Sequence, residues 1–185
     1  MARSGCKKGL KIGCGILALA ALVFGIWLYP TIRDLASLGL FDRESRHDYT
    51  GTVQQNLKAI HTALMLYHDS EQQFPAASGW MDAVKTRLKT DDLNKDQEFN
   101  KLRDPRVAGK DSEVYGFAMN RAVQGKYKDD IKDPDHTILV FCSSKLGWNA
   151  FGDPAEDGPR DELRGGNLAV TVSGKIGKIQ DLLKH

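Results

Sequence analysis

The sequence predicts an α+β fold, in which an N-terminal transmembrane helix precedes a long amphipathic helix packed on a small antiparallel sheet. Three observations predict it. Residues 12–29 carry no charge, and as a helix they would span about 27 Å, just enough to cross a hydrocarbon core. Residues 52–75 place apolar side chains at helical spacing on one face. Short apolar segments between residues 114 and 179 have the composition of strands.

The N-terminal stretch predicts a single-pass membrane protein. Residues 1–11 contain four basic side chains and no acid, and this basic flank predicts that the N-terminus lies in the cytoplasm. A cleaved signal peptide is the alternative. The long apolar run and its bulky exit, Trp27-Leu28-Tyr29-Pro30, which has no small-x-small cleavage site, favour an uncleaved anchor.

Composition limits the partners that the chain can bind. The 185 residues have a formal net charge of +2, and the scattered Lys and Arg side chains argue against nucleic-acid binding. The three cysteines include no CxxC pair, which argues against structural zinc. We therefore expect four parts: a cytoplasmic segment, a transmembrane anchor, a connector and an extracytoplasmic domain, at residues 1–11, 12–29, 30–50 and 51–185.

The helix at residues 52–75 is the element on which the rest of the domain is expected to pack. Thr50 and Thr52 are candidate N-caps, and Pro75 ends the helix. The apolar stripe consists of Val53, Leu57, Ile60, Leu64 and Tyr67, whereas Gln54, Gln55, Asn56 and Lys58 lie off it. His61 and His68 lie about 10 Å apart along the axis, too far to bind one metal ion. We expect them to be flank or core residues.

The remaining elements are shorter. Residues 79–88 repeat apolar side chains every four positions and predict a second helix, and the polar loop 90–112 is expected to contain one helical turn near Phe99 and Leu102. Strands are expected at residues 114–119, 137–142, 167–172 and 175–179. Ser173-Gly174 would join the last two in a tight hairpin. Residues 143–165 are expected to form a long loop.

Several motifs give the chain a resemblance to a known family. The helix QNLKAIHTALMLYHDSEQQFP, the segment YGFAMN, the strand DPDHTILVFCSS and the C-terminal LRGGNLAVTVSGKIGKI follow one another in order. Together they resemble the type IV pilin-like family, and within it the major pseudopilins of bacterial type II secretion. The resemblance covers about residues 50–180, and it implies a pilin-like fold for the extracytoplasmic domain.

Both ends of the chain depart from the family pattern. The family's C-terminal motif places Asp-Gly after a histidine; here Leu163 takes the histidine position and Ser173-Gly174 the Asp-Gly position. At the other end, Gly9 follows the basic leader as in prepilins. However, Cys14 stands where the family carries a glutamate that registers subunits in a filament. This difference favours a pilin-like head on a permanent anchor.

The sequence contains no pattern typical of catalysis. No GxSxG elbow, SxxK, HExxH or phosphate-binding loop is present, so we predict no enzyme activity, no cofactor and no catalytic, cofactor-binding or metal-binding residues. Cys142 is expected to be a small buried hydrophobe; the alternative is a nucleophile paired with His136. The acids in residues 153–162 offer oxygen ligands for calcium, and the alternative is a solvated acidic loop. They are Asp153, Glu156, Asp157, Asp161 and Glu162.

Two functional hypotheses follow. In the first, the chain is a membrane-anchored, non-enzymatic pseudopilin-like protein of the bacterial inner membrane, with its C-terminal domain outside. It would act by assembly or scaffolding in an envelope or type II secretion system. In the second, it is a stand-alone membrane-tethered binding or sensor domain that reuses the pilin-like fold. Expected partners are the bilayer and other proteins or further copies of the chain, and not nucleic acid.

Overall fold

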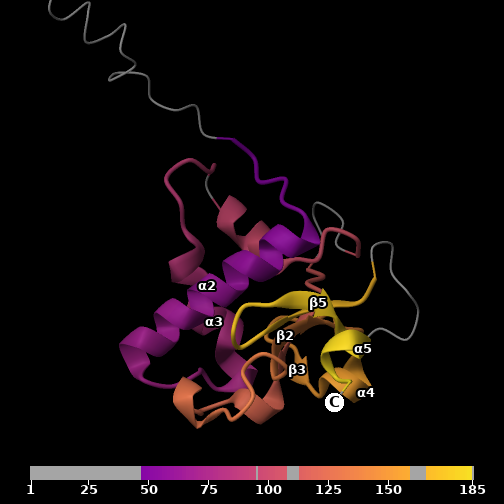
Figure 1. Cartoon of the computed structure of the whole chain (residues 1–185). Coiled ribbons are helices and arrows are strands. Elements are labelled where there is room, and N and C mark those ends of the chain that lie inside the picture. The colour runs from indigo at the N-terminus through magenta and orange to yellow at the C-terminus, as the bar shows by residue number, and fades with distance from the viewer. Residues whose placement is uncertain (1–46, 95, 108–112, 159–165, 185) are drawn as a thin grey trace, which may run out of the picture. The chain divides into compact units, whose positions relative to one another are not determined.

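The computed structural model describes residues 47–94, 96–107, 113–158 and 166–184 (Figure 1). The chain divides into two compact units, Met1–Ser45 and Arg46–His185. All described residues belong to the second unit. The predicted cytoplasmic segment, the predicted anchor at 12–29 and most of the connector therefore lie outside the described residues.

The long helix α2 spans Val53–Glu71. It begins with a capping box: the Gln55 amide donates to Thr52 Oγ1 at 3.3 Å, and the Thr52 amide donates to Gln55 Oε1 at 2.7 Å. It ends at Gln72, whose left-handed backbone (φ 60°) lets its amide donate to the His68 carbonyl. The helix therefore stops before Pro75, which the sequence predicted as its end.

One side of α2 is buried, as its apolar spacing predicts. Val53, Leu57, Ile60 and Leu64 are all buried. Two details differ from the prediction: Tyr67, placed on the stripe, is only half-buried, and Asn56, placed off the stripe by its polarity, is buried at 1% exposure. Asn56 lies three residues after Val53 and four before Ile60, so it shares their face.

The sheet has five strands in the order β3-β1-β2-β4-β5. Strand β1 pairs antiparallel with β2, β2 with β4 and β4 with β5, whereas β3 runs parallel to β1. The strands are Phe117–Asn120 (β1), Ile138–Cys142 (β2), Phe151–Gly152 (β3), Leu168–Thr171 (β4) and Ile176–Lys178 (β5). Strand β3 lies inside the loop that the sequence predicted for residues 143–165.

The predicted fold class was wrong. The structure is α+β, but its sheet is mixed rather than antiparallel, because β3 adds a parallel edge strand. Within the described part of the chain, none of the helices combines the length and apolarity needed to cross a membrane.

The sheet is covered on both faces (Figure 1). Helix α2 covers one face, where Val140 and Val170 belong to the main apolar core. Helix α5, Ile179–Leu182, covers the other face and packs with Phe141 and Ala169. Every residue of β2 is buried, in agreement with its continuous apolarity.

Short helical segments connect these layers. The predicted helix at 79–88 is divided into η1, Ala77–Gly79, then α3, Trp80–Val84, then η2, Lys85–Leu88. The helical turn expected near Phe99 and Leu102 is η3, Gln97–Leu102. The others are η4 (Arg121–Val123), η5 (Lys128–Asp130) and α4 (Pro154–Asp157).

Candidate functional site

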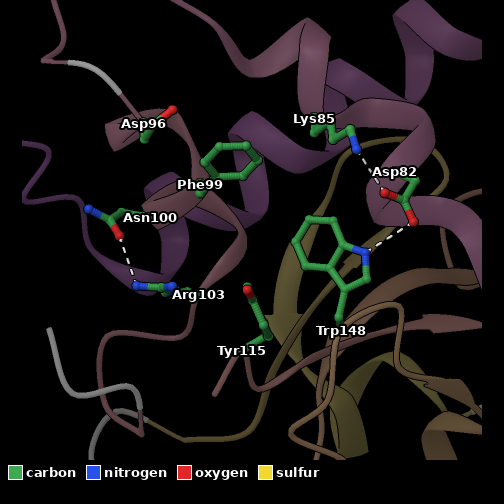
Figure 2. A pocket seen from close by; sticks show the side chains of 8 residues that line it. All are labelled: Asp82, Lys85, Asp96, Phe99, Asn100, Arg103, Tyr115 and Trp148. Carbon is green, nitrogen blue, oxygen red and sulfur yellow. Dashed lines mark hydrogen bonds and ion pairs between the residues drawn. The ribbon is translucent and has the colours of Figure 1, made fainter. Parts of the chain in front are cut away.

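The candidate site is a pocket between α3, η3 and the chain around residue 148 (Figure 2). Its volume of about 430 Å³ lies within the range of small-ligand sites. Aromatic and charged side chains line it: Asp82, Lys85, Asp96, Phe99, Asn100, Arg103, Tyr115 and Trp148. We call it the aromatic pocket.

The ring of Trp148 is fixed in the aromatic pocket by a hydrogen bond to Asp82. Trp148 Nε1 donates to Asp82 Oδ2 at 3.0 Å. The same carboxylate accepts from Asn149 Nδ2 at 2.7 Å and from Lys85 Nζ at 2.9 Å. The hydrogen bonds from Asn149, Lys85 and Trp148, in that order of importance, lower the pKa of Asp82 to about 2. Asp82 is therefore ionised at neutral pH and holds the indole as a charged acceptor.

Residues next to Trp148 attach the same segment to α3. Asn149 Oδ1 accepts from the Met81 amide at 2.7 Å, and so satisfies an N-terminal donor of the helix from another part of the chain. Trp80 is fully buried, and its Nε1 donates to the Ala150 carbonyl at 2.9 Å. These bonds, made by Asn149 and Trp80, attach the segment to the helix without using the face of the Trp148 ring.

Three aromatic rings meet in the pocket at steep angles. The Trp148 centroid lies 5.0 Å from that of Tyr115, with the ring planes at 68°, and 6.4 Å from that of Phe99, at 61°. These are edge-to-face contacts, which place a ring's positive edge on a negative face. The Arg103 guanidinium lies over the Tyr115 ring, 5.3 Å from its centroid.

A glycine places Tyr115 at the pocket instead of in the sheet. Gly116 has φ 78°, and a Cβ on it would lie 2.6 Å from Val107 Cγ2. Only glycine fits this conformation and this space. The predicted strand at 114–119 therefore begins late, at Phe117, and Tyr115 lies outside the ladder.

The buried Asn56 positions the opposite wall. Its Nδ2 donates to the carbonyls of Arg103, at 2.7 Å, and Asn100, at 3.2 Å, while its Oδ1 accepts from the Tyr49 hydroxyl at 2.7 Å. Asn56 lies on the buried side of α2, and its side-chain amide makes all three of these hydrogen bonds. Asn56 thus links the long helix to the segment that carries Phe99, Asn100 and Arg103.

Polar groups in the pocket keep hydrogen-bonding capacity. Among the described residues, the Tyr115 hydroxyl and the Asp96 carboxylate make no hydrogen bond, and Lys85 Nζ bonds only Asp82. Figure 2 shows the Tyr115 hydroxyl directed toward the space beside Trp148. The lining has two acids and two bases, so its formal charge is zero.

Cys142 and His136 do not form the nucleophile pair considered from the sequence. Cys142 is buried beside Arg106, whose Nη2 lies 2.9 Å from the sulfur. Burial raises the pKa of Cys142 to about 12, so the thiol is protonated at neutral pH. His136 instead contacts Asp133, with Nδ1 3.0 Å from the carboxylate oxygens.

Two of the acidic residues considered for calcium, Asp153 and Asp157, serve local structure. Asp153 caps α4 by accepting from the Ala155 amide at 2.8 Å. Asp157 accepts from the Asp153 amide and from Lys145 Nζ, both at 2.9 Å, and the Lys145 bond is the main reason that its pKa is lowered. Asp161 and Glu162 lie outside the described residues. In the part that the structure describes, no three acidic, histidine or cysteine side chains could together hold a metal ion.

The two helix histidines lie in the packing, where the sequence placed them. His61 Nε2 lies 3.1 Å from the Val172 carbonyl, and burial lowers the pKa of His61. His68 is buried against the rings of Phe74 and Tyr127, and its Nε2 accepts from the Lys128 amide at 3.0 Å. Their contacts are with different segments, so they do not form a common site.

The sequence reasoning missed the aromatic pocket. Its residues come from separate segments, and none belongs to a catalytic or metal-binding motif. The available signal was Trp148 itself, a large aromatic residue directly after Gly147 in a polar loop. Such a side chain needs either a core or a partner.

No protein-family model, curated protein or solved structure matches this chain. The resemblance to the pilin-like family therefore stays a prediction from the sequence motifs. Part of the C-terminal motif, including Leu163, lies outside the described residues.

Proposed function

We propose that the described domain is a non-enzymatic recognition domain that binds a partner molecule in the aromatic pocket. The observation that carries the proposal is the fixed ring of Trp148, which is partly exposed and hydrogen-bonded to Asp82. A ring fixed before binding loses little conformational entropy when a partner packs on it. Tryptophan, tyrosine and arginine, all present here, are also the residues that contribute most to binding energy at interfaces.

A purely structural role explains the pocket less well. The chain around residue 148 is already attached to α3 by Asn149 and by Trp80. A smaller polar side chain at 148 would leave both attachments in place. The free hydroxyl of Tyr115 also adds nothing to the fold, since it makes no hydrogen bond to the described residues.

The proposed setting is an assembly of the bacterial envelope, in which the domain acts as a scaffolding or binding component. The ordered motifs that resemble type II secretion pseudopilins support this setting. The predicted location, at the inner membrane with the domain outside, depends on residues 12–29. These lie outside the described residues, so the location stays a prediction.

Hydroxyl-radical footprinting tests the proposal without knowledge of the partner. Oxidation of Trp148 is compared between cells that carry the protein and the purified full-length chain. Tyr127, 38% exposed and not part of the pocket lining, is the internal control. We expect Trp148 to be protected severalfold in cells and Tyr127 to react equally. Equal reactivity of Trp148 in both samples would refute the proposal.

Photo-crosslinking separates assembly from ligand binding. A photoreactive amino acid replaces Asp96, which is exposed at the pocket, and in a control variant it replaces Leu66, which is 50% exposed on α2. Crosslinks to another protein or another copy from position 96 alone would support assembly. Protection of Trp148 without such crosslinks would support a small ligand.

A further inference from the structure

We propose that the aromatic pocket binds a neutral saccharide. This inference rests on the proposed recognition function and names the chemical class of its ligand. Three properties of the pocket point to this class: partly exposed aromatic rings without a free indole donor, polar groups that can donate or accept, and a zero formal charge.

The three rings of the pocket are partly exposed, so part of their surface is open to a ligand. Trp148 Nε1 is already bonded to Asp82, so this indole can recognise a ligand only through its carbon surface. An aromatic face is negative, and it attracts the weakly positive C–H bonds that lie on the flat sides of a sugar ring. Tyr115 and Phe99, at 68° and 61° to Trp148, line the same pocket.

Polar side chains line the pocket together with the rings. The Tyr115 hydroxyl can donate and accept, the Lys85 ammonium can donate, and the Asp96 carboxylate accepts. A hydroxyl also both donates and accepts, so it can pair with any of them. Hydrogen bonds from a neutral hydroxyl to a charged group are among the stronger ones in proteins.

Charge balance favours a neutral ligand over a charged one. Asp82 and Lys85 already neutralise each other at 2.9 Å, and Arg103 lies on the Tyr115 ring. An anion would face Asp96 and a cation would face Arg103, so each meets a repulsive partner as well as an attractive one. A zwitterion could meet both signs, and the experiment below includes it.

The two described tryptophans supply a probe and its control. The full-length chain is labelled with ¹⁵N-tryptophan, in buffer free of sugar-based detergents, and the Trp148 indole signal is assigned with W148F. Cellotriose, maltotriose and chitotriose are titrated in turn, then trigalacturonate, choline and the zwitterionic dipeptide alanyl-tyrosine. We expect a neutral trisaccharide to shift the Trp148 signal, while the signal of the fully buried Trp80 stays fixed.

Two conservative variants test the class of ligand without disturbing the network around Trp148. Y115F removes only the hydroxyl, and we expect it to weaken saccharide affinity by about threefold to tenfold. D96N replaces a charged acceptor by a neutral one, so affinity for a neutral saccharide should fall by only about threefold to tenfold, whereas affinity for a cation should be lost. Affinity for a neutral ligand should also be the same at low and high salt.

Each outcome decides the inference. A neutral sugar that shifts Trp148 and depends on Tyr115 supports it. Binding only of a charged or zwitterionic probe, with a large effect of D96N and of salt, overturns it and leaves the recognition function standing. If no probe shifts Trp148, the saccharide inference is also overturned, and footprinting in cells then decides the recognition function independently.

Discussion

The two described tryptophans, Trp80 and Trp148, meet at one contact but differ in what surrounds their rings. Both donate their indole N–H across the contact between α3 and the chain at 148–150: Trp80 to the Ala150 carbonyl and Trp148 to Asp82. Trp80 is fully buried in the core. Trp148 is partly exposed and lines the aromatic pocket. The two indoles therefore make the same kind of hydrogen bond, but only Trp148 keeps part of its ring exposed.

The difference separates stability from recognition. The ring of Trp80 contributes its whole surface to the core, which is the largest source of stability that a side chain can supply. The ring of Trp148 contributes only part of its surface to packing and leaves the rest available. Its acceptor, Asp82, is a charged side chain that two other donors also hold, so the ring is fixed without being covered.

Replacing each tryptophan by alanine should give the largest contrast. W80A leaves a cavity in the core and should lower the free energy of unfolding by about 3–5 kcal/mol. W148A loses one hydrogen bond and partial packing, and should cost about 1–2 kcal/mol. Urea denaturation of the full-length chain measures both. Equal costs would show that Trp148 is as much a core residue as Trp80, and would remove the basis of the recognition proposal.

Asn149 should have an intermediate effect, because it both caps α3 and bonds the carboxylate that holds Trp148. It caps α3 through Met81 and also donates to Asp82. N149A should lower stability by about 1 kcal/mol, the usual cost of losing a helix cap. It should also broaden the Trp148 indole signal, since Asp82 loses its strongest partner, while the signal of Trp80 stays sharp. The same change in both signals would mean that the segment detaches as a whole.

Elements defined by local sequence could be predicted. Helix α2 has regular apolar spacing and a capping box within residues 52–55, and β2 is apolar throughout. Both follow from interactions within a few residues of one another. The burial of Leu57 and Ile60 followed directly from this spacing, whereas the choice of Thr52 over Thr50 as the N-cap came from the structure.

Features that depend on distant partners could not be predicted. Strand β3 consists of two residues, and it exists only because β1 lies beside it. Asn56 was placed outside because it is polar, and its burial is possible only because carbonyls of Arg103 and Asn100 accept its hydrogen bonds. The aromatic pocket likewise combines side chains from segments 82–85, 96–103, 115 and 148. No local pattern places these together.

The smallest expected effect concerns the acid titration of Asp82, and it tests how firmly Trp148 is fixed. The pKa of Asp82 in the folded chain is about 2, below the ordinary 3.8. The stabilising effect of its ionised form is therefore present above pH 3.8 and is lost as pH falls toward 2. Because the carboxylate is half exposed, solvent screening keeps this effect small.

Variants of its three donors should raise the pKa of Asp82 by different amounts. The hydrogen bonds from Asn149 and Lys85 each contribute more than that from Trp148, and Lys85 adds the attraction of its charge, so N149A and K85Q should both raise the pKa more than W148F does. Carboxyl ¹³C NMR titration of the full-length chain measures each value, and Asp181, exposed and paired with Lys184, serves as the control. An unchanged pKa of Asp82 in W148F would show that the indole is not bonded to it in solution. The ring would then be free to turn, and its preorganisation for a ligand, on which both proposals depend, would be lost.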